Sequence, residues 1–135
     1  PHAMVKMDIT DIQYPDDAFD VVYCSHVLEH VPDDRGALGE IRRVLKPNGW
    51  AVLLVPITAE ETFEDPSVTD PDERLRLFGQ EDHVRRYGPD FADRVEEAGF
   101  DLNIVRAANF IDSETTNQMG IDSTEKIYVC ARQSS

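Results

Sequence analysis

The chain has 135 residues, of which 41% are hydrophobic and 30% charged, and these values predict a soluble globular domain with a core of its own. Its formal net charge of -14 repels the phosphates of nucleic acid, which is therefore not expected as a partner. No apolar stretch approaches the roughly 20 residues of a membrane-spanning helix, and the first residues hold no signal-peptide core, so we expect a cytoplasmic protein without a membrane partner.

The N-terminal segment is expected to contribute one strand. Pro1 to Ala3 have the character of a cloning remnant ahead of Met4. Val5 to Ile9 is a short strand candidate, and a polar loop that contains Pro15 follows it.

The segment from Phe19 to Val31 (FDVVYCSHVLEHV) predicts a strand that ends in polar side chains. Its apolar first half is rich in β-branched and aromatic residues, and at Ser25 it gives way to a short helical turn. In open α/β sheets, ligands bind outside the carboxyl ends of the strands. Cys24, Ser25 and His26 are therefore where we expect a binding site.

A helix and a second strand follow this turn. Asp33 or Asp34 can cap the helix, whose apolar residues recur at helical spacing: Ala37, Leu38, Ile41, Val44 and Leu45. Pro47 to Gly49 predict the turn out of the helix. The continuously apolar run from Trp50 to Val55 then predicts a strand that is covered on both faces, which completes a right-handed βαβ unit.

The second half of the chain alternates polar links with short elements. Residues 57–74 are acidic and loop-like, which indicates a solvated connection, with a lid over a binding cleft as the alternative. Pro89 begins a helix that Gly99 closes. Residues 100–107 and 126–132 predict two strands, and because the link between them holds no strong helix, we expect them to pair antiparallel.

Taken in order, these segments resemble the C-terminal part of a class I S-adenosylmethionine-dependent methyltransferase of the small methyltransferase-domain type. Three runs carry the resemblance: Asp8 to Asp20 (DITDIQYPDDAFD), Val21 to Pro32, and Arg42 to Trp50 (RRVLKPNGW). The resemblance implies an α/β, Rossmann-like sheet with a C-terminal antiparallel strand pair, formed by residues 1–135 as a single partial domain. It also implies methyl transfer from S-adenosylmethionine to an unidentified small-molecule acceptor.

The resemblance implies cofactor roles for five residues. Asp8 matches the acid that accepts the adenine amino group, and Ile9 matches the residue whose backbone N–H meets an adenine ring nitrogen. Such a pair is needed because an adenine edge is costly to bury without hydrogen bonds. Cys24, Ser25 and His26 match the wall beside the methionine part of the cofactor.

Catalysis in this family depends mainly on geometry, because the sulfonium methyl group is already activated. A base is needed only if the acceptor must lose a proton early, and His26 is then the first candidate, with His83 behind it. Arg85 to Tyr87 can hold an anionic acceptor, although a solvated surface segment is the simpler explanation. His83, Arg86 and Tyr87 are therefore the candidate acceptor contacts.

The sequence departs from the family in its glycines. The family binds the cofactor with a glycine-rich turn after its first strand and with an acid after its second strand that holds the ribose hydroxyls. None of the seven glycines here forms a GxG, and no room for two strands precedes Val5. We therefore expect an N-terminally truncated sheet that binds cofactor weakly or not at all on its own. The alternative is a catalytically silent remnant that serves as an oligomerisation or interaction module.

A truncated sheet would leave the edge of the strand from Val21 to Cys24 bare. Because an apolar, unpaired strand edge recruits another chain, we expect a homodimer or swapped oligomer through this edge, or a separate chain that supplies the missing part.

Two further patterns predict no special chemistry. Residues 26–30 fit the zinc-peptidase pattern H-x-x-E-H, but Pro32 ends the turn almost at once, so no metal is expected. Glu29 and His30 are instead expected to satisfy backbone groups at the strand end. Cys24 and Cys130 are expected to be buried free thiols.

Overall fold

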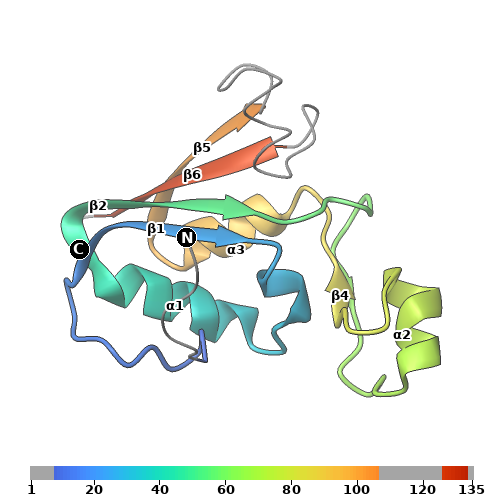
Figure 1. Cartoon of the computed structure of the whole chain (residues 1–135). Coiled ribbons are helices and arrows are strands. Elements are labelled where there is room, and N and C mark those ends of the chain that lie inside the picture. Colours follow the sequence, from blue (N-terminus) through green and yellow to red (C-terminus); the bar gives the residue numbers. More distant parts are fainter. Residues whose placement is uncertain (1–7, 107–125, 134–135) are drawn as a thin grey trace, which may run out of the picture.

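A computed structural model describes residues 8–106 and 126–133 of the chain (Figure 1). Its centre is a four-stranded sheet whose strands lie in the order β1 (Phe19–Ser25), β2 (Leu45–Leu54), β6 (Lys126–Arg132) and β5 (Phe100–Arg106). Strands β1 and β2 are parallel, whereas β6 runs antiparallel to both of its neighbours. The predicted α/β fold and its closing antiparallel strand pair are thus confirmed.

The predicted βαβ unit is formed by β1, helix α1 (Asp34–Val44) and β2. The Asp33 carboxylate caps α1 by accepting a hydrogen bond from the Gly36 N–H at 2.9 Å. The apolar face of the helix is buried as its spacing predicts, with these residues inward: Ala37, Leu38, Ile41 and Val44. A single 3-10 turn, η1 (Leu28–His30), joins β1 to this helix.

The predicted turn at Pro47 to Gly49 is wrong. The chain leaves the helix at Leu45, whose backbone is already extended, and Leu45 pairs with Phe19 of β1. The register then shifts before Val21 pairs with Trp50, so residues 46–49 form an irregular bulge within β2. Proline and glycine suit such a bulge because the first donates no ladder hydrogen bond and the second has no side chain.

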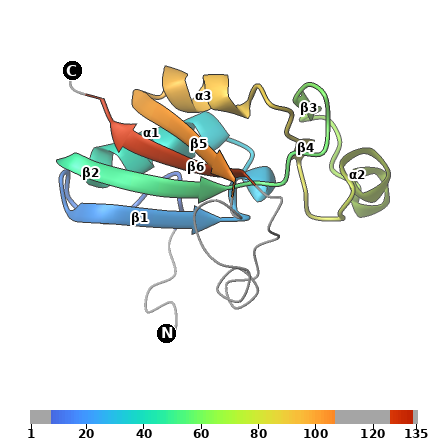
Figure 2. The ribbon, with the colours of Figure 1, turned by 90° about the horizontal axis from the view of Figure 1, so that it is seen from above.

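The sheet has one face that helices cover and one that they leave open. Helix α1 and helix α3 (Phe91–Glu97) pack with the first face over the main core, to which Cys24, Leu53 and Tyr128 belong. Figure 2 looks onto the other face, with α1 behind the sheet. Of the side chains on that face, Val21 is 45% exposed, Tyr23 50% and Trp50 41%. The expectation that the run from Trp50 to Val55 is covered on both faces therefore fails at Trp50, whereas Leu54, on the same face, is buried.

Residues 56–90 form a small unit beyond the carboxyl ends of β1 and β2, to the right of the sheet in Figure 1. Its elements are β3 (Phe63–Glu64), α2 (Pro71–Phe78) and β4 (Arg85–Arg86), and β3 pairs antiparallel with β4. Residues 57–74 are mostly exposed, as expected of a solvated connection, but they include β3 and the first turn of α2. Pro71 stands in the first turn of α2 and Asp70 caps it, and at that position a proline favours a helix.

The described start of the chain is a turn. Asp8 forms an isolated bridge with Asp11, and Ile9 and Thr10 lie between them, so the strand expected over Val5 to Ile9 does not include its last two residues. Residues 5–7 of that strand, and the remnant expected at residues 1–3, lie outside the described residues. None of the helices in the described part of the chain is long and apolar enough to cross a membrane.

Candidate functional site

The carboxyl ends of β1 and β2 carry the polar residues that the sequence placed there. Strand β1 ends at Ser25, and His26 follows it with a φ of 56°, in the left-handed region. Its backbone N–H donates to the Leu54 carbonyl at 2.9 Å, which ties the turn to the end of β2. A non-glycine residue held at positive φ marks a sharp, costly turn, and such turns are frequent at functional sites.

A cleft of about 540 Å³ runs along β1. It brings together three of the predicted cofactor residues, namely Ile9, Cys24 and Ser25, among mostly apolar walls. Asp8 and His26 are not among the described residues that line it. The Asp8 carboxylate is engaged by the N–H and hydroxyl of Thr10 at 2.8 and 2.6 Å, and these hydrogen bonds lower its pKa.

The two cysteines are inert, as predicted. Both are buried and free. Burial, and for Cys24 also the nearby Glu29 carboxylate, raises the pKa of each thiol to about 12. At neutral pH these sulfurs are therefore protonated and serve as small apolar groups.

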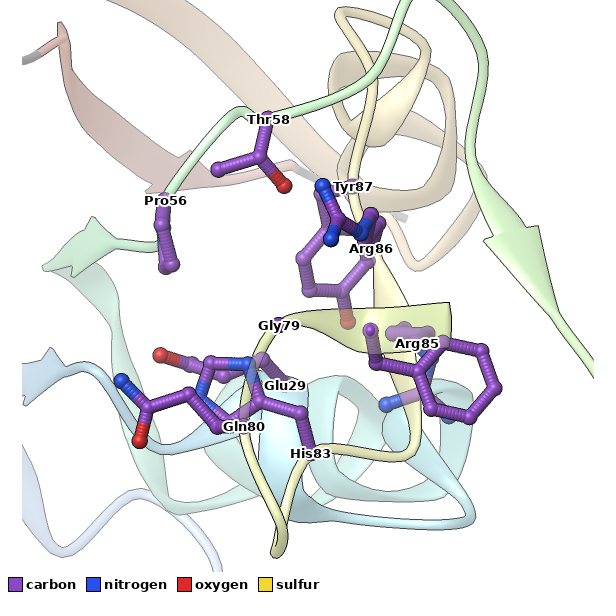
Figure 3. Close-up of a pocket in the computed structure, with 10 residues that line it drawn as sticks. Glu29, Pro56, Thr58, Gly79, Gln80, His83, Arg85, Arg86 and Tyr87 are labelled. Atoms are coloured by element: carbon purple, nitrogen blue, oxygen red, sulfur yellow. The ribbon is translucent and has the colours of Figure 1, made fainter. Parts of the chain in front are cut away.

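A second cavity, of about 190 Å³, lies between η1, the segment that follows β2, and the segment from α2 to β4 (Figure 3). It gathers all three candidate acceptor contacts, His83, Arg86 and Tyr87. In Figure 3, Pro56 and Thr58 lie across the cavity from Gln80 and His83. The Arg86 Nε donates to the Leu77 carbonyl at 2.9 Å, which fixes this side chain against α2.

Arg85 is a structural residue and no part of a solvated surface. It is 2% exposed, and its guanidinium donates to the carbonyls of Leu28, Val31 and Pro32 at 2.6, 2.6 and 2.9 Å. Its Nε also donates to Glu64 at 2.9 Å. The expectation of a solvated segment at residues 85–87 is therefore wrong, since Tyr87 is buried as well.

Sequence reasoning missed Asp34 and Glu64, which are the acidic partners of Arg85 and Arg94. Asp34 accepts hydrogen bonds from the Tyr87 hydroxyl at 2.5 Å and from Arg94 at 2.7 Å. Burial and the Asp34 carboxylate together raise the pKa of Tyr87. Burial alone would raise the pKa of Glu64, but its hydrogen bonds with Arg85 and Arg94 outweigh burial and lower it. No sequence signal marks these partners, because they come from segments 21 to 60 residues away.

Two histidines meet at the edge of this second cavity. The rings of His30 and His83 lie edge to face with centroids 4.6 Å apart. Burial, followed by the neighbouring His30, lowers the pKa of His83, which favours a neutral imidazole at pH 7. His30 contacts the backbone as predicted, through Nδ1 and the Asp82 carbonyl at 3.1 Å. The same expectation is wrong for the Glu29 side chain, whose buried Oε1 has no hydrogen-bond partner among the described residues.

Comparison with known proteins shows a similarity to methyltransferases in the first part of the chain. Residues 1–53 match the family described as "Methyltransferase domain". A sterol 24-C-methyltransferase of Aspergillus fumigatus is 45% identical over 47 residues, which are 35% of this chain and 12% of that protein. The chain thus matches only a small part of this relative's length.

Solved structures agree in fold. A putative methyltransferase from Bacillus halodurans superimposes with a TM-score of 0.59 at 16% identity, over 96% of this chain and 71% of that one. The 1,6-didemethyltoxoflavin-N1-methyltransferase of Burkholderia thailandensis, solved with S-adenosylhomocysteine, gives 0.61 at 14% identity, over 96% and 50%. By its sequence match over residues 1–53 and by its Rossmann-like fold, the chain is similar to class I S-adenosylmethionine-dependent methyltransferases.

Proposed function

We propose that this chain is part of an enzyme that transfers a methyl group from S-adenosylmethionine to a small-molecule acceptor. The observation that carries the proposal is the family match over residues 1–53, because this segment contains β1 and the turn that follows it. Cys24, Ser25 and His26 stand there at the carboxyl end of a parallel strand, where open α/β sheets bind ligands.

The described residues fit one wall of a cofactor site. The apolar cleft beside Ile9, Cys24 and Ser25 suits the flat face of a base, since ligand pockets are mostly apolar with a few polar groups. To accept the adenine amino group, Asp8 would have to exchange its hydrogen bonds with Thr10 for that contact. The 135 residues hold no GxG turn, so we propose that the remaining cofactor contacts come from residues outside them and that this chain alone binds weakly.

On the acceptor side, the 190 Å³ cavity would orient the substrate through Arg86 and Tyr87, which line its wall. S-Adenosylmethionine supplies an activated methyl group, so the contribution of the protein is alignment of the acceptor. Where the acceptor carries a proton that must leave, His26 is the proposed base at the end of β1. His83, which lines the cavity and has a lowered pKa, is the second candidate.

The cofactor wall can be tested by nuclear magnetic resonance. Titration of the ¹⁵N-labelled chain with S-adenosylhomocysteine up to millimolar concentration should shift the backbone amide signals of Ile9, Cys24 and Ser25. Ile9→Lys places a charge in the apolar cleft and should abolish these shifts, whereas Ile104→Lys, at an exposed position on β5, should preserve them. Absence of any shift in the cleft at the highest concentration would contradict the assignment.

A second candidate function, as an interaction module, is favoured by the open face of β1. This strand pairs only with β2 in the described sheet, and it carries the exposed side chains of Val21 and Tyr23, with the exposed Trp50 beside them on β2. We propose that two copies of the chain associate through this edge as a homodimer or swapped oligomer, since an unpaired apolar strand is a template for pairing. The buried free cysteines are consistent with a reducing, cytoplasmic setting.

Light scattering coupled to size exclusion tests the association. The native chain should elute as a dimer at micromolar concentration, and Tyr23→Lys should shift it toward monomer because a buried lysine at the interface would lack a partner. Ile104→Lys is the matched control on the opposite edge strand and should leave the mass unchanged. A monodisperse monomer for the native chain would contradict the proposal.

A further inference from the structure

One carboxylate oxygen of the buried Glu29 side chain has no hydrogen-bond partner among the described residues. The residue is 2% exposed, and this oxygen is Oε1. A buried carboxylate without a partner is costly, and in proteins such groups are normally paired, hydrogen-bonded or bound to a metal ion. The orphan oxygen belongs to a residue that lines the 190 Å³ cavity.

Two histidines stand beside this carboxylate. Glu29, His30 and His83 each offer one ligand atom, and the three atoms lie within 4.8 Å of one another. Glu29 and His30 belong to η1, whereas His83 comes from the segment between α2 and β4, about 50 residues away. Figure 3 shows Glu29 and His83 on the same side of the cavity.

The His30 ring is held by a backbone carbonyl in the way that metal-bound histidines usually are. The Asp82 carbonyl can only accept, so His30 donates to it from Nδ1, which leaves Nε2 as the ring nitrogen that can bind an ion. Such outer contacts fix the tautomer and orient the ring toward an ion.

We propose that Glu29, His30 and His83 bind a divalent transition-metal ion, for which Zn²⁺ is the best chemical fit. Two imidazoles and one carboxylate form a three-ligand set that leaves a fourth position open, here toward the cavity. Tetrahedral zinc with bonds of about 2.1 Å brings its ligands about 3.4 Å apart, so side-chain rotation must draw these atoms together by up to about 1.4 Å.

The surrounding charges permit a cation at this place. Arg85 and Arg86 line the same cavity, but their guanidinium groups are directed at backbone carbonyls and at Glu64. The ion would connect η1 to the unit formed by β3, α2 and β4. The proposal does not invoke the cofactor, but it bears on the acceptor site: a His83 bound to Zn²⁺ could not also act as the base, which would leave that role to His26.

The proposed site of Glu29, His30 and His83 differs from the H-x-x-E-H pattern in its third ligand. In that pattern His26 and His30 share a helix face, which requires a continuous α-helix. Here η1 is a single 3-10 turn that begins at Leu28, after the left-handed residue His26. His83 therefore takes the place that the pattern assigns to His26.

Calorimetric titration of the full chain with ZnCl₂ tests the site. We expect one equivalent of Zn²⁺ to bind at micromolar concentration and to raise the temperature of unfolding, since an ion that binds only the folded state stabilises it. Glu29→Gln and His83→Asn should each weaken binding by about 100-fold or more. Co²⁺ should give the visible absorption bands of a four-coordinate nitrogen and oxygen site in the native chain alone.

His26→Asn is the matched control, because it removes a histidine from the same turn and asparagine tolerates positive φ. This variant should bind Zn²⁺ as the native chain does. Circular dichroism verifies that each variant is folded, and His83→Asn, at a half-buried position, keeps the test decisive if Glu29→Gln does not fold. No saturable Zn²⁺ binding by the native chain, or an equal loss in His26→Asn, would overturn the proposal.

Discussion

Replacing Arg85 by methionine should lower the free energy of unfolding by about 3–5 kcal/mol. Methionine keeps most of the volume of the side chain but removes its donors. The carbonyls of Leu28, Val31 and Pro32 would then lose their guanidinium partner in a buried place, and Glu64 would lose one of its two arginines. Each buried acceptor left without a donor carries its own desolvation penalty, so the losses accumulate.

Urea denaturation followed by circular dichroism measures this change. Arg76→Met is the matched control, because Arg76 makes an ion pair with Glu73 on the exposed face of α2 and such pairs contribute little. The control should unfold at nearly the native urea concentration. Equal midpoints for the two variants would show that the Arg85 network does not hold η1 against β4.

The sequence predicted the βαβ unit because its signals are local. Apolar spacing over residues 37–45, a capping aspartate at Asp33 and a run of β-branched residues in β1 each act within a few residues of the element they define. The turn at Pro47 to Gly49 was misplaced because the same residues suit a bulge, and the choice depends on the pairing of Leu45 with Phe19. That pairing is a long-range contact that local spacing does not encode.

The sequence offered His83, Arg86 and Tyr87 as candidate contacts, but it did not predict the cavity that they line, for a similar reason. Its walls are held by Arg85, whose main acceptors are backbone carbonyls, and a carbonyl is present at every residue whatever the side chain. Glu29 and His83 meet where the Val84 N–H donates to the Glu29 carbonyl at 3.0 Å, a contact between segments more than 50 residues apart. The wall along β1 was easier to find, since Cys24 and Ser25 end a strand that is visible in the sequence.

The second large effect is expected at Phe91, on α3. This ring is fully buried between Tyr87 and Tyr128, with centroids 4.7 and 4.9 Å away in edge-to-face contacts. Phe91→Ala should lower the free energy of unfolding by about 3–5 kcal/mol, because it removes a large apolar group and leaves a void that its neighbours fill only in part. Thermal and urea unfolding measure the loss.

Phe91→Leu separates the void from the aromatic contacts. Leucine fills most of the space, so this variant should lose about 1.5 kcal/mol or less if packing volume is what matters. The Tyr87 ring also lines the 190 Å³ cavity, and its hydroxyl is held by Asp34, so a shift of this ring in Phe91→Ala would loosen a hydrogen bond as well as a contact. Phe91→Ala should therefore lower the free energy of unfolding by more than the void alone would. An equal loss of unfolding free energy in Phe91→Ala and Phe91→Leu would mean that the edge-to-face contacts, and not the filled volume, hold α3 to the sheet.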